Sequence, residues 1–243
     1  GTAELIHELE EEGAECVRVV ACDVADRGQV EALLAGVDAA HPWTGVFHLA
    51  AVLDDGLLVS QSGERLAGVW GAKAAGACHL DELTRELDLA AFVLFSSAAG
   101  VFGGAGQSNY AAANAFLDAL AVRRRAGGLP AVSVSWGLWQ QAGVGLTASL
   151  GQAELARMRR QGITALTTEQ GLAALDAALA QPYPHLVAVR LELTPLQREA
   201  DNGGQVPGLV RNLLRAPRRR AGEAGGASSG LRERLLALPA GER

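Results

Sequence analysis

The sequence predicts an α/β protein built on an open, doubly wound parallel sheet with helices on both faces. Three observations support this class. The apolar runs are short, they lack the polar alternation of a half-exposed strand, and helical segments separate them. Apolar residues make up 49% of the 243 residues and charged residues 20%, which is enough for one sizeable core.

The expected elements alternate along the chain. The expected strands occupy residues 16–24, 45–53, 90–97, 131–137 and 185–193. The expected helices occupy residues 3–14, 25–34, 62–87, 111–128 and 168–180. Gly13 is a natural stop for the first helix, and Asp26 is a natural N-cap for the second.

Composition excludes several classes of protein. The net charge of −6 and the pI of about 5.4 leave no basic stripe for nucleic acid. The sequence shows neither an N-terminal signal peptide nor an apolar stretch long enough to span a membrane. The three cysteines, Cys16, Cys22 and Cys78, lack metal-ligand spacing, so we expect reduced, buried thiols, no metal site and a cytoplasmic location.

The predicted strand ends gather residues that could bind a ligand. In doubly wound sheets, ligands bind outside the carboxyl ends of the strands. The residues expected at those ends are Asp23, the segment 50–55, Ser97, Trp136 and Gly137. The sequence therefore predicts one shared cleft.

Four polar residues form a candidate reactive group: Lys73, Ser97, Tyr110 and Asn114. A phenol is a poor acid at neutral pH unless a cation or hydrogen bonds stabilise its phenolate, and Lys73 is the only lysine beside 20 arginines. Ser97 could hold a carbonyl oxygen beside Tyr110, and Asn114 lies one helical turn after Tyr110. Each residue alone has a simpler reading: a cap for Ser97 or Asn114, and chance for Lys73.

These residues carry a resemblance to a known family. The stretches "SSAAGVFGGAGQSNYAAAN" and "GVWGAKAAGACHL" resemble the catalytic ketoreductase domain of modular type I polyketide synthases, in the short-chain dehydrogenase/reductase superfamily. Most members of that superfamily have the lysine four residues after the tyrosine. Here Asn114 occupies that position and the lysine is residue 73, as in the polyketide branch. The resemblance implies a Rossmann-like sheet and catalysis by Lys73, Ser97, Tyr110 and Asn114.

The resemblance also implies an NADPH cofactor. The residues that it assigns to the cofactor are Asp23, Val24, Ala50, Ala51, Lys73, Tyr110, Trp136 and Gly137. The family binds the phosphates on a glycine-rich turn in a first βαβ unit. That unit is lacking here, because "GVFGGAG" follows the Ser97 strand. We therefore expect an N-terminally truncated fragment that binds NADPH weakly or not at all.

The resemblance further assigns residues to substrate and stereochemistry. The substrate-binding residues that it implies are Leu53, Asp54, Asp55, Phe102 and Gln107. The "LDD" triplet at 53–55 resembles the B-type fingerprint, which implies a D-configured hydroxyl, although by itself it could be a solvated acidic turn. Ala112 stands where epimerising B-type enzymes have proline, so we expect no epimerisation.

The domain boundaries follow from the same comparison. We expect a partial ketoreductase domain over 1–195 with a lid helix over 145–163, then a helix and linker over 196–230. Residues 231–243 resemble the start of an acyl carrier protein, which would present the phosphopantetheine-tethered substrate. The expected function is reduction of a β-ketoacyl thioester; the alternatives are an inert structural remnant and a free-standing short-chain alcohol dehydrogenase.

Overall fold

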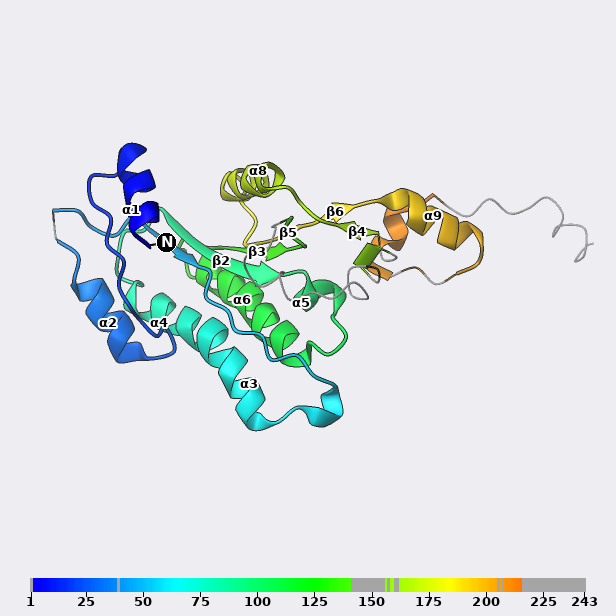
Figure 1. Cartoon of the computed structure of the whole chain (residues 1–243), viewed down its shortest axis with the longest axis horizontal. Helices are drawn as coiled ribbons and strands as arrows, with labels where there is room; N and C mark the ends of the chain where they lie inside the picture. Colours follow the sequence, from blue (N-terminus) through cyan, green and yellow to red (C-terminus); the bar gives the residue numbers. More distant parts are fainter. Residues whose placement is uncertain are drawn as a thin grey trace, which may run out of the picture. The chain divides into compact units, whose positions relative to one another are not determined.

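A parallel four-stranded sheet forms the centre of the fold (Figure 1). The computed structural model describes residues 2–38, 40–140, 156, 158–159, 162–204, 206 and 208–215. The strands, in sheet order, are β1 (Gly45–His48), β2 (Ala91–Ser97), β3 (Val132–Trp136) and β5 (His185–Ala188). Each strand runs parallel to its neighbour, which confirms the predicted fold class.

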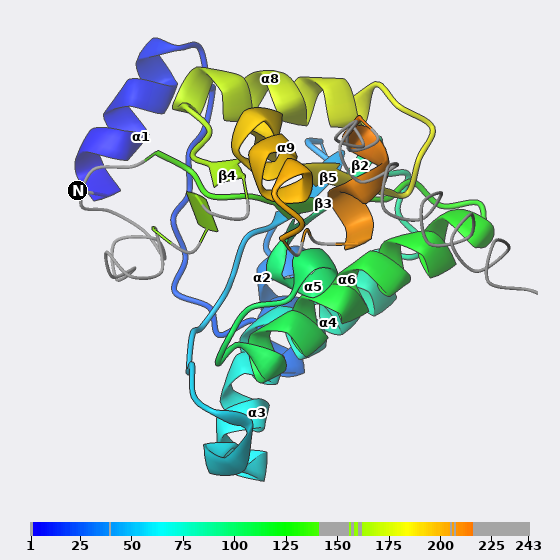
Figure 2. The same ribbon diagram turned by 90° about the vertical axis from the view of Figure 1, so that its right-hand side faces the viewer.

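Helices cover both faces of the sheet, as predicted (Figures 1 and 2). One face carries α3 (Gly63–Trp70), α4 (Gly76–Leu83) and α6 (Ser108–Ala126), and the other carries α8 (Thr168–Leu179). The shorter elements are η1 (Leu58–Ser60), α5 (Ala99–Phe102), β4 (Ile163–Thr164) and β6 (Arg190–Leu191). A second compact unit contains α9 (Leu193–Asp201) and η4 (Gly208–Leu213).

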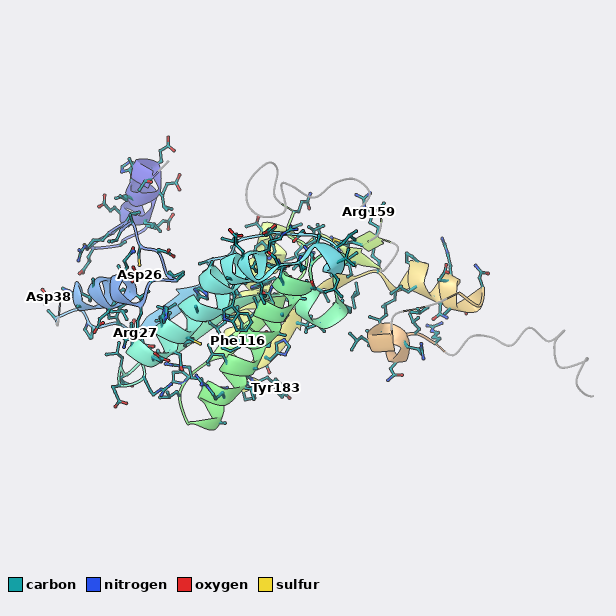
Figure 3. The ribbon with its side chains drawn as sticks, turned by 90° about the horizontal axis from the view of Figure 1, so that it is seen from below. Asp26, Arg27, Asp38, Phe116, Arg159 and Tyr183 are labelled. Carbon is teal, nitrogen blue, oxygen red and sulfur yellow. The ribbon has the colours of Figure 1, made fainter. Side chains whose placement is uncertain are left out.

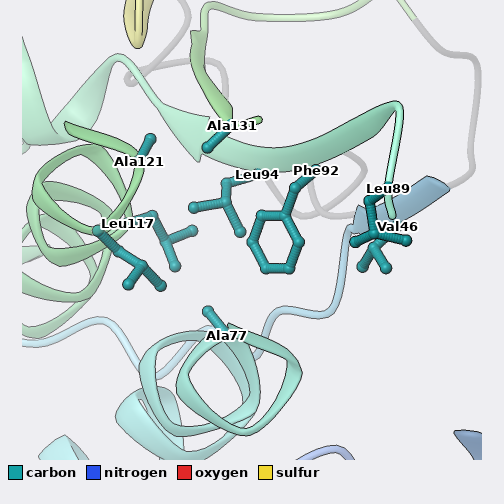
Figure 4. Packing of buried hydrophobic residues seen from close by; sticks show 9 residues of the cluster. Val46, Ala77, Leu89, Phe92, Leu94, Leu117, Ala121 and Ala131 are labelled. Carbon is teal, nitrogen blue, oxygen red and sulfur yellow. The ribbon is translucent and has the colours of Figure 1, made fainter. Parts of the chain in front are cut away.

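The main hydrophobic core lies between the sheet and the α4–α6 layer (Figure 4). Phe92 and Leu94 of β2 point toward Leu117 and Ala121 of α6 and toward Ala77 of α4. All five residues are almost fully buried. This packing fixes α6, and therefore Tyr110 near its start, against the carboxyl half of β2.

A second core lies on the α8 side and shows how β3 divides its residues. Val132, Val134 and Trp136 pack there. Successive strand residues point to opposite faces, so Ser133 and Ser135 point toward α6, and both are fully buried. The α6 face of this central strand is therefore polar.

The expected strand over 16–24 is wrong. The segment has no regular secondary structure, and none of the described residues pairs with it. A strand needs a neighbour for its backbone N–H and C=O groups, and without one the apolar pattern is not sufficient. Val19 and Val20 are about half exposed, and residues of this segment and of α2 (Arg27–Ala35) line a cavity of about 280 Å³.

The helices at the start of the chain are confirmed. α1 (Thr2–Glu11) ends shortly before Gly13, which has a φ of 101°. Asp26 caps α2, because its carboxylate accepts hydrogen bonds from the N–H groups of Gly28 and Gln29 at 2.9 and 3.3 Å (Figure 3). The expectation of buried thiols is wrong, since Cys16 is exposed and Cys22 and Cys78 are only partly buried.

Two further differences concern the middle of the chain. The helix expected over 62–87 is interrupted by a wide π-helical turn, Gly71–Ala75, and the predicted strand over 45–53 ends at His48. Most of the expected lid helix over 145–163 and all of the expected carrier-protein start over 231–243 lie outside the described residues. Within the described part of the chain, none of the helices has the length and apolar character needed to cross a membrane.

Candidate active site

Lys73 is held inside the protein by the π-helical turn. The N–H of Gly76 donates to the carbonyl of Gly71, five residues earlier, so the helix is widened around Lys73. The side chain is only 2% exposed, and its Nζ donates to the carbonyl of Phe95 on β2 at 2.7 Å. On the backbone side, Nε2 of the buried His48 lies 2.9 Å from the Lys73 carbonyl oxygen. The ammonium group is therefore fixed beside the end of β2.

Burial changes the acidity of this ammonium. Loss of hydration lowers the pKa of Lys73 from 10.5 to about 8, and the negative charge of Asp118 opposes that fall. Lys73 is thus a cation near neutral pH, but one that loses its proton much more easily than a surface lysine.

Tyr110 lies beside Lys73, as the prediction of a reactive group requires. The Lys73 Nζ is 5.4 Å from the centroid of the Tyr110 ring. Ser97, at the end of β2, and Asn114, one turn later on α6, lie near the Tyr110 phenol, because the side chains of both act to lower its pKa. The structure thus brings together all four residues of the predicted reactive group.

The acidity of Tyr110 differs from the expectation that a lysine would lower it. Burial raises the pKa of Tyr110 above its ordinary value of 10, and the side chains of Ser97 and Asn114 offset only part of that rise. The charge of Asp55 raises it further. In this structure the phenol is therefore a neutral, proton-bearing group at physiological pH.

Asn114 contributes an unused polar atom. Its Nδ2 donates to the carbonyl of Tyr110 at 2.7 Å, which locks the first turns of α6. Its Oδ1 is fully buried without a hydrogen-bond partner. A buried acceptor without a partner costs free energy, so this atom is suited to bind a donor from a ligand or water.

The LDD turn is fixed to the loop that precedes Tyr110. The Asp54 carboxylate accepts from Nε of Arg65 at 2.9 Å, and the Arg65 guanidinium also donates to the Asp55 carbonyl at 2.7 Å. Across the gap to the loop, Gln107 Nε2 donates to Asp55 Oδ2 at 2.9 Å, and Asn109 Nδ2 donates to the Asp54 carbonyl at 2.8 Å. Two acidic residues and Gln107 of the predicted substrate set are therefore in contact.

The residues expected to bind the cofactor are more widely distributed. Trp136 pairs with Ser97 across the β2–β3 ladder, but its side chain packs against Phe95 and Trp139 in the core. The backbone there is also occupied, because the Trp136 carbonyl accepts from the N–H of Ala98 and the Gly137 N–H donates to the Ala188 carbonyl, both at 2.8 Å. Val24 is held to α4 by a contact of 3.1 Å between its carbonyl and Nδ1 of His79.

The other expected ligand-binding residues surround the strand ends without a direct contact to Tyr110. Asp23 accepts the N–H of Ala25, and Ala50, Ala51 and Leu53 follow β1 in an irregular segment. Gly137 follows β3, and Phe102 ends α5. No hydrogen bond, ion pair or ring contact joins these residues to Tyr110 in the described part of the chain.

The residues present fit one half of a nicotinamide nucleotide. Lys73, Tyr110 and the unpartnered oxygen of Asn114 could bind its ribose and nicotinamide end. Across the described ranges, however, no glycine-rich turn leads from a strand into a helix to hold the pyrophosphate. Nor do the described side chains place three His, Cys, Asp or Glu residues together for a metal ion.

Comparison with known proteins decides the family. The sequence profile described as "KR domain" matches residues 1–141, more than half of the chain. The chain belongs to the KR-domain family. Over the full chain it is 53% identical to polyketide synthase GfsA of Streptomyces halstedii and 46% identical to the mycoketide-CoA synthase of Mycobacterium tuberculosis. It spans only 3% and 6% of those two proteins.

Solved structures of KR domains have the same fold. A structure described as A-type ketoreductases from a modular polyketide synthase is 42% identical, with a TM-score of 0.78, over 88% of this chain and 44% of that chain. A C2-type ketoreductase is 38% identical, with a TM-score of 0.73, over 85% of this chain and 44% of that chain. Because these relatives are of different types, the similarity leaves the stereochemical type of this KR domain open.

The sequence interpretation missed several residues that shape this KR domain. Arg65 lies in a predicted helix, and nothing in the neighbouring sequence marked it as part of the site. Its role depends on the LDD turn, which folds back onto α3. His48 and Ser96 looked like strand residues. Asp118 had a visible signal, because it continues the helical spacing of Tyr110 and Asn114 and faces the two serines of "VSVSW".

Proposed function

We propose that this KR domain is the catalytic part of an NADPH-dependent ketoreductase that reduces a β-ketoacyl thioester tethered to an acyl carrier protein. One observation carries the proposal: the only lysine lies 5.4 Å from the Tyr110 ring, and the side chains of Ser97 and Asn114 act on the same phenol. A reductase needs a proton donor, a cation and a carbonyl anchor at one point. A purely structural KR domain has no need to keep all four.

Tyr110 is the proposed proton donor. The phenol carries its proton at neutral pH, which is the state that a general acid needs, but its raised pKa makes it a weak acid on its own. As the proton leaves, negative charge develops on the phenol oxygen, and the nearby Lys73 ammonium stabilises that charge. Ser97 holds the carbonyl oxygen of the substrate beside the phenol, and Asn114 fixes the backbone of Tyr110.

The reduction balances with one cofactor. When bound, NADPH supplies the hydride that adds to the carbonyl carbon. The proton from Tyr110 goes to the carbonyl oxygen, so the ketone gains two hydrogens and becomes a hydroxyl. Lys73 and Asn114 would hold the ribose end of the nucleotide, and the rest of its binding site belongs to parts of the protein other than the described residues.

We further propose a B-type reaction with a D-configured product and without epimerisation. The LDD turn supports this, because Arg65, Gln107 and Asn109 hold it in one place beside the loop that leads to Tyr110. A rigid turn of this kind could guide the phosphopantetheine arm into the cleft from one side. The proposed division of the chain is a KR domain over 1–195, a connecting segment over 196–230 and the start of a carrier protein over 231–243.

The test uses a matched pair of tyrosine variants. The chain contains two tyrosines, and Tyr183 is 58% exposed on the loop before β5 (Figure 3). The chain is joined behind the N-terminal half of a KR relative, and NADPH oxidation is measured with a β-ketoacyl thioester. Tyr110→Phe should lower turnover about a hundredfold or more, because the proton donor is lost. Tyr183→Phe should retain the parent rate.

The outcomes separate the proposal from its alternatives. Equal turnover in Tyr110→Phe and the parent would remove Tyr110 as the acid. A parent hybrid that binds NADPH but reduces no thioester would favour the inert structural remnant. Chiral chromatography of the product decides the type, and an L-configured hydroxyl would contradict the B-type assignment.

A further inference from the structure

The described residues bury two cations and two carboxylates, and only one pair is in direct contact. The buried cations are Lys73 and Arg124, and the buried carboxylates are Asp81 and Asp118. Arg124 donates to Asp81 at 2.8 Å, so each of these two buried charges has an opposite charge in contact. Lys73 and Asp118 are left, and a buried charge without an opposite charge is strongly unfavourable.

A continuous polar layer joins the two remaining groups. Lys73 donates to the carbonyl of Phe95, and the next residue, Ser96, donates its hydroxyl to the carbonyl of Asn114 at 3.2 Å. The Ser96 oxygen lies 3.3 Å from the Ser135 hydroxyl, which in turn lies 3.3 Å from Asp118 Oδ2. All these groups lie between α6 and the sheet.

Asp118 faces the sheet from the same side of α6 as the reactive residues. Tyr110, Asn114 and Asp118 are four residues apart, so they line one face of the helix. The carboxylate accepts from the Ser133 hydroxyl at 2.7 Å, and its other oxygen lies 3.4 Å from Nε2 of His185. Hydroxyls satisfy its hydrogen-bonding capacity without neutralising its charge.

We propose that Asp118 is the counter-charge that keeps Lys73 an ammonium ion inside the protein. It acts through the low-dielectric polar layer rather than by contact, since no ion pair joins the two side chains where the structure describes them. Asp118 is a positioning residue, because the described hydrogen bonds lead from it through Ser135 and Ser96 to the Asn114 carbonyl and not to the phenol. Its importance for catalysis rests on the proposed function, whereas the charge coupling does not.

Four ionisable groups surround this pair and enter the design of the test. His48, on β1, lies against the Lys73 backbone, and its own pKa is lowered first by burial and then by the Lys73 charge. Tyr110 on α6 lies beside the Lys73 ammonium. His185 on β5 would neutralise Asp118 when protonated, so a His185→Gln background removes that charge from the measurement. The negative charge of Asp55 acts on Tyr110 and raises its pKa.

The experiment exploits the single lysine. Labelling the chain with lysine enriched in ¹³C at Cε gives one NMR resonance, and its pH titration reports Lys73 alone. The parent midpoint should lie at about 8. In Asp118→Asn it should fall by about one pH unit, because a nearby negative charge favours the ammonium. Asp118→Glu retains the charge and should stay near the parent value.

Matched controls and a reciprocal measurement keep the proposal falsifiable. Asp176→Asn makes the same chemical change at an exposed position of α8, on the opposite face of the sheet, and should leave the midpoint unchanged. If Asp118→Asn does not fold, Lys73→Met in the ¹³Cγ-aspartate-labelled chain gives the answer instead. Coupling between two sites is reciprocal, so that variant must raise the Asp118 midpoint by the same amount.

An unchanged Lys73 midpoint in folded Asp118→Asn, or an unchanged Asp118 midpoint in Lys73→Met, would overturn the proposal. Neither result depends on thioester reduction. Conversely, if Tyr110→Phe keeps full activity, the proposed function fails while the Lys73–Asp118 coupling stands.

Discussion

The α4–α6 layer satisfies its two buried carboxylates in different ways. Asp81 on α4 accepts hydrogen bonds from three guanidinium groups, those of Arg85, Arg123 and Arg124. Asp118, half-way along α6, has serine hydroxyls and an imidazole around it. The three guanidinium groups in contact with Asp81 neutralise its charge directly. Asp118 retains its charge and lies on the side of the layer where the reactive residues gather.

The pKa values follow this difference. Burial alone would raise the pKa of Asp81, but the hydrogen bonds from Arg124 and Arg85 outweigh it and hold the pKa below its usual range. Lys73, without a carboxylate in contact, has its pKa lowered to about 8 by burial. A buried carboxylate in contact with cations, such as Asp81, therefore contributes to stability. A buried cation without a carboxylate in contact, such as Lys73, has a protonation state that its surroundings can change.

The largest effect is expected at the closely paired carboxylate. Asp81→Asn should lower the free energy of unfolding by about 3–5 kcal/mol, because it leaves the fully buried Arg124 guanidinium without an opposite charge. Urea denaturation at neutral pH measures this. Arg85→Gln, at a half-exposed side chain, should cost about 1 kcal/mol or less. A similar loss of unfolding free energy in Asp81→Asn and Arg85→Gln would show that contact with the buried Arg124 is not the main contribution of Asp81.

Acid should remove the same contribution from the parent protein. The folded-state pKa of Asp81 lies below its ordinary value of 3.8, so this stabilisation is complete above that value and is lost as the pH falls through the folded-state pKa. Asp81→Asn should lack this component of acid destabilisation.

Lys73 should also make the protein more stable as the pH rises, but in the alkaline range. Its folded-state pKa of about 8 lies below the ordinary 10.5, so folding disfavours the ammonium, and stability rises as the pH passes from about 8 to 10.5. Relative to Lys73→Met, the parent should gain about 3 kcal/mol across this window. Urea unfolding of both proteins at the two pH values gives the difference. A constant difference would show that the ammonium is not buried.

Asp118→Asn should cost less than Asp81→Asn. Its partners are two serine hydroxyls and the His185 imidazole, and the hydroxyls can turn to bond with an amide oxygen, so we expect a loss of about 2 kcal/mol in the free energy of unfolding. The same urea titration at neutral pH measures it. A loss as large as that of Asp81→Asn would mean that a cation touches Asp118 directly.

Ser133→Ala should have the smallest effect. It removes the 2.7 Å hydrogen bond to Asp118, whereas the Ser135 hydroxyl stays within 3.3 Å of the carboxylate. We expect a loss of about 1 kcal/mol, because the carboxylate is not left unsatisfied. A loss above that of Asp118→Asn would show that Ser133 has a structural role of its own.

Short-range patterns predicted most of the fold. The apolar runs at β2 and β3 and the N-cap at Asp26 depend on residues close in sequence, and the structure has them within a few residues of the expected positions. The strand over 16–24 was wrong because its formation depends on a partner, which no local pattern shows.

The candidate site was predictable only in part. Lys73, Ser97, Tyr110 and Asn114 were recognisable from residue type and resemblance, and the structure brings them together. The raised pKa of Tyr110 was not predictable from the sequence, because it depends on how deeply the side chain is buried. Arg65 was not predictable either, since its partners are the Asp54 carboxylate and the Asp55 carbonyl, which the LDD turn brings to it.

The widened turn at Gly71–Ala75 sets the rotation between α3 and α4. Each residue of a regular helix advances the chain by about 100° of rotation. A π-helical turn takes up one extra residue within about the same rotation, so the helical segments before and after it keep their relative orientation. With regular winding over the same residues, α4 would be rotated relative to α3 by about 100°, and either Ala77 would leave the core or Lys73 would turn away from β2.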